Sequence, residues 1–341
     1  MPVTAATLRH MRTLVLDLEA VTDGQLRELT RAYVDGFDTV VGQLRDALQE
    51  LADEPITRSR IERSSRIASA LQAIADSLNG LAAQTAVVIT DGVGQVTSIS
   101  VTAQAAIAGS QLPAAGYPLV SVNPDVIGSV VARTSQNITA RSRPLAEAGQ
   151  VAVRRALLEG ASASDNPVKV ARNMVRLARA GAVDLPLYRA EAISRTELLD
   201  ASRAATQAWG EANSSTLQGW EWLSSRSATT CPACWGQDGT LHELTETGPD
   251  GHPNCGCTRM LRTKTWRELG IDLDEPSALA RISAEDHFRD LPKATQQQIM
   301  GPARLKALND GAPWSSLAVE KPNADWRRSF QVRPVRDLVP A

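Results

Sequence analysis

Apolar residues recur every three or four positions along most of the first 213 residues, which is the period of an amphipathic α-helix. Between residues 4 and 51 this pattern predicts two helices, with Thr22 and Asp23 as the N-cap of the second. The apolar stripe of the second helix covers about seven turns, so it must pack against neighbouring helices or against other copies of the chain. The stripe consists of Leu26, Leu29, Tyr33, Phe37, Val40, Leu44, Leu48 and Leu51.

Further helices are predicted along the chain up to residue 213. One begins near Ile56 and reaches Leu81, and another begins at Asn123. The Arg143-Pro144 pair should interrupt or kink that segment, with a separate helix over 145–159. The run 162–167 should cap a helix that follows it, and a long helix is expected over 187–213.

The period then changes to two, which is typical of strands. Residues 217–223 and 260–266 are predicted to pair as a hairpin, with the intervening residues as its long connection. The fold class is therefore mainly α with a small α+β C-terminal domain. We expect a helical N-terminal region over 1–118, a hairpin-containing domain over 119–270, and a helical segment with an extended tail over 271–341.

One long stretch is almost free of charge. Residues 67–132 contain no Lys or Arg, and their acidic residues are Asp76, Asp91 and Asp125. A hydrated surface normally carries more charge. The stretch is therefore either buried within the fold or packed against partner chains, and the sequence leaves both open. Gly92 and Gly94 should break any helix there.

The composition limits which partners the chain can bind and indicates the redox state of its compartment. The formal net charge of −2 and the pI near 6.1 predict no global attraction to nucleic acid or to an anionic membrane. The N-terminus lacks the pattern of a signal peptide, and no membrane span is expected. All four cysteines fall within residues 231–257. In a chain without an export signal such a cluster favours metal binding over disulfides.

The cysteine-containing stretch has the spacing of a metal site. Two cysteines three residues apart are followed about twenty residues later by a histidine and two more cysteines, which offers five candidates for four tetrahedral positions. This surplus favours a closed structural zinc site that takes the place of a core in a loop-rich segment. Disulfides, plain core cysteines and a catalytic zinc are the alternatives. His242 and His287 are expected at the surface, and Glu243 and Glu246 in solvent. The candidate ligands are Cys231, Cys234, His252, Cys255 and Cys257.

These motifs, taken in order, resemble the MuF-like minor head proteins of the phage head morphogenesis family. The resemblance covers residues 120–265 and rests on Ser194-Arg195-Thr196-Glu197, Trp220-x-Trp222, Cys231-x-x-Cys234, Asp238-Gly239 and the stretch His252 to Cys257. Gly256 stands where the family usually has a basic residue, and Arg259 is a candidate to supply that charge. The first 110 residues resemble nothing we can name.

The resemblance implies a non-enzymatic structural protein of a tailed bacteriophage. Such a protein acts in procapsid assembly at or near the portal, in few copies, and bears on DNA packaging or exit. Its implied partners are the portal protein and other head proteins, with self-association through the N-terminal helices. Its implied location is the virion, and the host cytoplasm during assembly.

Two other functions are compatible with parts of the sequence. A zinc-braced nuclease of the HNH kind would need a second histidine as general base, and only His242 is near enough in sequence. Contact with packaged DNA, or with an acidic portal surface, would use the basic stretch 133–179, which also holds Lys169. The candidate contact residues there are Arg133, Arg141, Arg143, Arg154, Arg155, Arg172, Arg176 and Arg179.

Overall fold

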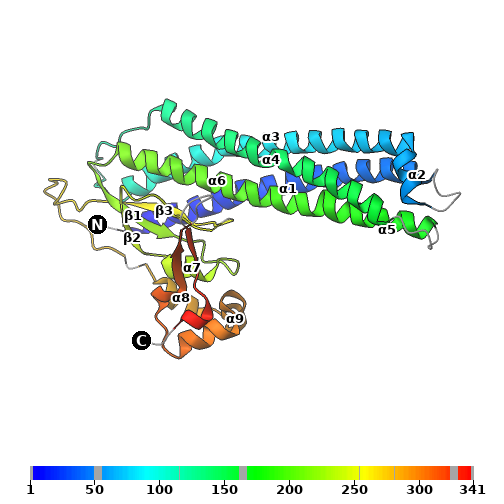
Figure 1. Ribbon diagram of the computed structural model, residues 1–341. Helices are drawn as coiled ribbons and strands as arrows, with labels where there is room; N and C mark the ends of the chain where they lie inside the picture. The colour runs from blue at the N-terminus through cyan, green and yellow to red at the C-terminus, as the bar shows by residue number, and fades with distance from the viewer. Residues whose placement is uncertain are drawn as a thin grey trace. The chain divides into compact units, whose positions relative to one another are not determined.

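The computed structural model describes residues 3–49, 56–114, 116–160, 167–252, 254–279, 281–322 and 329–338. Long helices contain most of the described residues up to Ala212, and short helices and strands follow in the rest of the described chain (Figure 1). This confirms the predicted fold class. The helices of the first part are α1 (Ala5–Gln49), α2 (Arg58–Arg63), α3 (Ser65–Gly109), α4 (Pro124–Gly160), α5 (Pro167–Arg179), the π-helical segment η1 (Ala180–Asp184) and α6 (Leu185–Ala212).

The chain divides into two compact units made of discontinuous segments. The helical unit comprises Thr22–Val93 and Ala132–Glu197, and the cysteine unit comprises Met1–Val21, Gly94–Val131 and Leu198–Ala341. The helices α1, α3, α4 and α6 each contribute residues to both units. The three consecutive domains expected from the sequence are a different kind of division and stay a prediction.

The core of the helical unit is built from the predicted apolar stripes. Tyr33, Val40, Leu44 and Leu48 of α1 are buried, and Leu51 lies outside the described residues. They belong to one hydrophobic cluster that also includes residues of α3, α4, α5 and α6. Because no single amphipathic helix of this kind can bury its stripe alone, the packing of these helices stabilises each of them. The described part of the stripe therefore packs mainly against other helices of the same chain.

Two predicted helix boundaries are wrong. The structure has one continuous helix over Ala5–Gln49, in which Thr22 is a buried interior residue and caps nothing. It also has one helix over Pro124–Gly160, with Pro144 inside it, in place of a separate helix over 145–159. A proline in a helix interior costs about 3 kcal/mol, but Leu145 and Ala146 are buried in the hydrophobic cluster, and this packing offsets the cost. The predicted cap at 162–166 lies outside the described residues.

The expected break at Gly92 and Gly94 is also wrong, because α3 runs from Ser65 to Gly109. Gly92 instead makes room for a buried side chain. A Cβ atom at this position would lie 1.8 Å from Nε2 of Gln25. That amide donates to the Val88 carbonyl at 2.7 Å, and its Oε1 accepts from Ser194 Oγ at 3.2 Å. The glycine is therefore a close-approach position within the helix and not its end.

The nearly charge-free stretch is partly buried and partly exposed. Val88, Ile89, Val93 and Val96 of α3 are buried, while Val87 on another face is 60% exposed. Among the described residues, α3 is the one helix long and apolar enough to cross a membrane, and 39% of its most apolar stretch is buried. Because a core helix of a soluble protein meets the same criteria, this is weak support for a membrane span.

The cysteine unit contains a three-stranded antiparallel sheet in the order β2-β1-β3. The predicted strand 217–223 is confirmed as β1, which pairs with β3, where 260–266 was predicted. The register places Trp220 opposite Leu261. The elements that follow α6 are β1 (Leu217–Leu223), α7 (Pro232–Gln237), β2 (Leu241–Glu243), β3 (Thr258–Thr263), α8 (Ala284–Asp290), α9 (Lys293–Asn309), η2 (Trp314–Leu317), β4 (Ala318–Lys321), β5 (Ser329–Val332) and η3 (Val335–Asp337).

Two buried glutamines pair with the free edge of β3. Gln104 in α3 donates to the Arg259 carbonyl at 2.7 Å and accepts from Leu261 N at 3.2 Å. Gln111 donates to the Leu261 carbonyl at 2.9 Å and accepts from Thr263 N at 3.3 Å. Each amide side chain thus acts like the peptide group of a further strand, which satisfies backbone groups that would otherwise be buried without partners.

Candidate metal centre

The first pair of cysteines is positioned by the short helix α7. Cys231 is its N-cap residue in an extended conformation, and Pro232 occupies the first helical position, where a proline is tolerated. The backbone N–H of Cys234 donates to Cys231 Sγ at 3.4 Å. One helical turn therefore brings both sulfurs to the same side, as the C-x-x-C spacing requires for shared ligation.

The second half of the centre is a turn that leads into β3. Asn254 has a φ of 65°, and Asn adopts this left-handed region more readily than most residues. The turn lets the Cys255 N–H donate to the His252 carbonyl at 3.1 Å. Pro253 lies outside the described residues. The chain then reaches Cys257 immediately before the first residue of β3.

The five predicted ligand residues come together. Nε2 of His252 lies 3.0 Å from Cys231 Sγ and 3.8 Å from Cys234 Sγ, and the sulfurs of Cys234 and Cys255 are 3.5 Å apart. Zn–S bonds of about 2.3 Å would place two sulfurs about 3.8 Å apart around a tetrahedral ion. The ligand atoms form two groups, each spanning no more than 4.8 Å, namely Cys231, Cys234 and His252, and Cys234, Cys255 and Cys257. Cys234 belongs to both groups.

The chemistry of these donors fits a cation. The pKa of Cys231 is lowered to about 5, chiefly by a hydrogen bond with the Cys234 thiol and further by His252, against burial, which raises it. Hydrogen bonds with Cys234 and Cys257 hold the pKa of Cys255 well below its usual range. The pKa of Cys234 is shifted in the opposite direction, because its hydrogen bonds with Cys231 and Cys255 raise it. Without a cation, the buried sulfurs cannot all be thiolates together, whereas a divalent ion would stabilise them all as thiolates.

A buried arginine of α6 holds the second half of the centre. The Arg203 side chain is 6% exposed and forms an ion pair with Asp200 at 2.6 Å. It donates to the Cys257 carbonyl at 2.9 and 2.7 Å and to the Cys255 carbonyl at 2.5 Å. Burial by itself lowers the pKa of Arg203, but Cys255, Asp200 and Cys257 together raise it above its ordinary value. Arg203 is therefore a permanent positive charge beside the sulfurs.

The cysteines lie in a hydrophobic core. Cys234, Cys255 and Cys257 are buried in one cluster with Trp209, Leu217, Trp220, Trp222, Leu261 and Ala108. The expectation that a metal takes the place of a core in this segment is therefore wrong. Residues from α3, α6, β1 and β3 pack around the sulfurs, so an ion there would add to an existing core.

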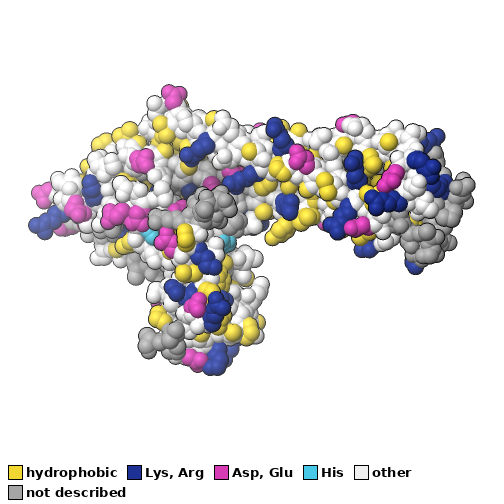
Figure 2. Space-filling view, in the orientation of Figure 1, with side chains coloured by type: hydrophobic (Ala, Val, Ile, Leu, Met, Phe, Trp, Pro, Cys, Tyr) yellow, Lys and Arg dark blue, Asp and Glu magenta, His cyan; other side chains and the backbone are white. Residues whose placement is uncertain are grey.

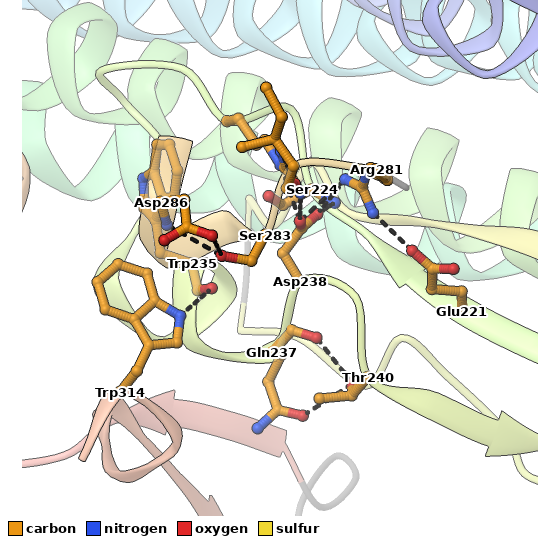
Figure 3. A network of polar contacts seen from close by, with 12 residues as sticks. Glu221, Ser224, Trp235, Gln237, Asp238, Thr240, Arg281, Ser283, Asp286 and Trp314 are labelled. Atoms are coloured by element: carbon orange, nitrogen blue, oxygen red, sulfur yellow. Dashed lines mark hydrogen bonds and ion pairs between the residues drawn. The ribbon is translucent and has the colours of Figure 1, made fainter. Parts of the chain in front are cut away.

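Polar contacts hold the other side of α7 (Figure 3), and a second apolar cluster packs against it. Asp238, at the end of α7, has a side chain that is 0% exposed and pairs with Arg226 at 2.6 Å and Arg281 at 2.9 Å. Arg281 also reaches Glu221 of β1 at 2.7 Å. Trp235 is buried with residues of α8, α9 and η2, including Phe288, Met300 and Leu317. Trp235 and Asp238, which follow Cys234 in α7 and at its end, are therefore held by the apolar cluster and by the arginine pairs respectively.

The other histidines lie outside both ligand groups. The ring of His242 stacks on Trp220 with centroids 4.1 Å apart, and its side chain is 15% exposed, so it is less of a surface residue than expected. His287 stacks on Trp235 at 5.9 Å. Glu243 and Glu246 are exposed, as predicted. Oε2 of Glu246 lies within hydrogen-bond distance of Nδ1 of His242, at 3.0 Å.

Arg259, which was a candidate to replace the basic residue that the phage family usually has at the position of Gly256, does not lie at the surface. It is buried, its guanidinium lies 4.6 Å from the Trp220 ring centre, and it donates to the carbonyls of Glu246 and Gly248. Burial lowers its pKa to about 10. In this position Arg259 fastens the loop before the second half of the centre to the sheet.

The eight predicted contact arginines all belong to the helical unit and are all exposed. They do not form one patch. Arg141 pairs with the buried carboxylate of Glu197, and Arg133 precedes Arg154 in α4 by about 30 Å of helix. Arg154 and Arg155 line a groove between α3 and α4.

No known protein family, no curated protein and no solved structure matches this chain. The likeness to the phage head morphogenesis family therefore rests on the motifs alone.

Proposed function

We propose that this protein is a structural minor head protein of a tailed bacteriophage, which acts in head assembly at or near the portal. The Cys/His centre holds one structural Zn²⁺ ion, and the long helices provide the surface for the portal protein or for other copies of the chain. No step of catalysis belongs to this function.

The burial of the centre is the observation that carries this proposal. Cys234, Cys255 and Cys257 are buried among tryptophans, and only Cys231 and His252 are half-buried. A catalytic zinc keeps a coordination position open for water and substrate, whereas a structural zinc is enclosed by four protein ligands. Five candidate donors in such surroundings favour the enclosed kind. The order of motifs on a mainly helical fold supports the choice of family.

Purified particles of the phage that encodes this chain test the proposal. We expect mass spectrometry to detect the chain in heads, at a small fraction of the abundance of the major capsid protein, and cross-linking to join it to the portal protein. A phage carrying Cys234→Ser should incorporate less of the chain. Absence of the chain from both procapsids and mature particles would rule the proposal out.

A zinc-braced nuclease is the alternative that the sequence left open. It would need His242 as general base beside the bound metal. The two ring nitrogens of His242 instead face Thr240 at 2.9 Å and Glu246 at 3.0 Å, and the ring stacks on Trp220. This packing argues against the alternative.

A nicking assay gives the direct test of the nuclease. We expect supercoiled plasmid to stay intact when it is incubated with Mg²⁺ and either the unchanged chain or His242→Ala, because both ring nitrogens of His242 already face Thr240 and Glu246. Metal-dependent nicking by the unchanged chain that disappears in His242→Ala would establish the nuclease instead.

A further inference from the structure

We propose that one end of the helical unit binds duplex DNA through its phosphates, without regard to sequence. The surface, here called the basic end, gathers cations from three separate stretches of the chain. This proposal goes beyond the proposed function and does not depend on it. Its members are Arg58, Arg60, Arg63, Arg66, Arg154, Arg155, Lys169, Arg172, Arg176 and Arg179.

The structure brings these three stretches together. The groove beside α2 is lined by Ile61, Glu62 and Ser64 of the α2 region and by Arg154 of α4. Ile61, Leu157 and Met174, from α2, α4 and α5, belong to the same hydrophobic cluster. Figure 2 shows Lys and Arg gathered at the end of the helical unit that carries α2 and α5, with few acidic groups among them. The sequence alone placed only the residues of α4 and α5 in one stretch.

The basic end has a clear surplus of positive charge. Four described acidic residues accompany its ten cations: Glu62, Glu159, Asp184, which pairs with Arg179 at 3.7 Å, and Glu147, which lines the same groove as Arg154 and Arg155. Four more acidic residues at 50, 53, 54 and 165 lie outside the described residues. The surplus over the described acidic residues is six, and it is still two if all four of these are also counted against the surface. The chain as a whole has a net charge of −2, so this charge is concentrated locally.

The cations on α5 have the spacing of a phosphate-binding row. They occupy positions 169, 172, 176 and 179, which fall on one face of the helix, and all four are exposed. The row is about 15 Å long. Phosphates on one DNA strand follow each other by about 3.4 Å along the axis, so the row can follow several of them. Nine of the ten cations of the basic end are arginines, whose planar forks bind phosphate oxygens with two hydrogen bonds.

A membrane surface fits this end less well. A helix that binds a lipid interface buries its apolar face among the acyl chains. The apolar residues Val170, Met174 and Ala178 of α5 are instead buried in the core of the helical unit. The helix therefore presents its cations and not its apolar face. The ion pairs Arg58–Glu62 and Arg155–Glu159 are exposed and hold their partners only weakly, so phosphates can replace the carboxylates.

Binding of a random-sequence duplex by the full chain tests the proposal. We expect the affinity to fall steeply with salt concentration. In the triple variant Arg63→Gln, Arg154→Gln, Arg172→Gln, the slope of log K against log salt should be smaller by about three units. The matched control is Arg9→Gln, Arg12→Gln, Arg267→Gln, which removes the same charge from exposed positions of the cysteine unit and should keep the slope. Thermal melts establish that both triples are folded.

Each other outcome overturns the proposal. A salt slope near zero, or equal losses in the two triple variants, would remove the basic end as the DNA surface. Displacement of the duplex by polyglutamate of equal charge concentration would assign the surface to an acidic protein. Equal binding to anionic vesicles would assign it to a membrane. The experiment uses no phage particle, so its failure is separate from a failure of the proposed function.

Discussion

Replacement of Cys234 by serine is expected to remove the bound zinc and to unfold part of the cysteine unit. The unchanged chain should contain about one zinc per molecule, and Cys234→Ser should contain almost none, because Cys234 belongs to both groups of ligand atoms. Structural zinc contributes about 10–16 kcal/mol to the folding of small zinc domains. Here the surrounding tryptophan core should retain part of the fold, so we expect protease sensitivity over about residues 215–270 and not throughout the chain.

Elemental analysis and limited proteolysis, with a chelator as a second route to the zinc-free state, measure these effects. Serine replacements of Cys231, Cys255 and Cys257, one at a time, identify the four ligands among the five candidates. The replacement that leaves the zinc content unchanged marks the spare cysteine. A full complement of zinc in Cys234→Ser, or an unchanged protein that binds none, would contradict the prediction.

Two glycines provide a matched pair of substitutions that changes none of the five candidate ligand residues. A Cβ atom at Gly251 would lie 2.2 Å from Cys255 Sγ, whereas a Cβ atom at Gly256 would meet nothing within 4 Å. Gly251→Ala must therefore displace a ligand and should weaken zinc binding at a cost of about 1–3 kcal/mol, while Gly256→Ala should not. Equal zinc affinity in the two variants would indicate that Cys255 is not a ligand.

The grouping of the five candidate ligands could be predicted from the sequence because each half of the centre is local. Cys231 and Cys234 are joined by one helical turn, and His252 and Cys255 by one tight turn. The core around them could not be predicted in the same way. That Trp209, Trp222 and Leu261 pack around the sulfurs depends on the pairing of β1 with β3 and on the position of α6, which are long-range contacts.

The same distinction applies to the helices. Their apolar periodicity predicted most of the buried positions, although Leu26 and Phe37 are only half-buried. Local cap and breaker signals at Thr22, Gly92 and Pro144 gave wrong boundaries. At Gly92 the deciding contact comes from Gln25, 67 positions earlier in the sequence. The roles of Gln104 and Gln111 were missed for the same reason. Two buried glutamines in a nearly charge-free helical stretch were the signal, since a buried amide must find partners, but those partners lie in β3.

Substitution of Arg203 is the second change for which we expect a large effect. Arg203→Met removes the donor to the carbonyls of Cys255 and Cys257 and also removes the ion pair with Asp200. Breaking one side of a buried ion pair costs about 3–5 kcal/mol. We therefore expect a loss of this size in the free energy of unfolding, measured by denaturant titration of the zinc-loaded chain.

Arg195→Met is the matched control on the same helix. Arg195 also faces an aspartate, Asp23, but at 3.6 Å and with a side chain that is 43% exposed, so its loss should cost no more than about 1 kcal/mol. A specific role at the centre should also appear in zinc affinity, measured by competition with a chelator, and in the spectrum of the cobalt-substituted protein. Arg203→Lys should restore stability only in part, because an ammonium group keeps the charge but cannot reproduce the fork that joins two carbonyls. If Arg203→Met lowers stability but leaves both the zinc affinity and the cobalt spectrum unchanged, Arg203 supports the fold alone and does not position the ligands.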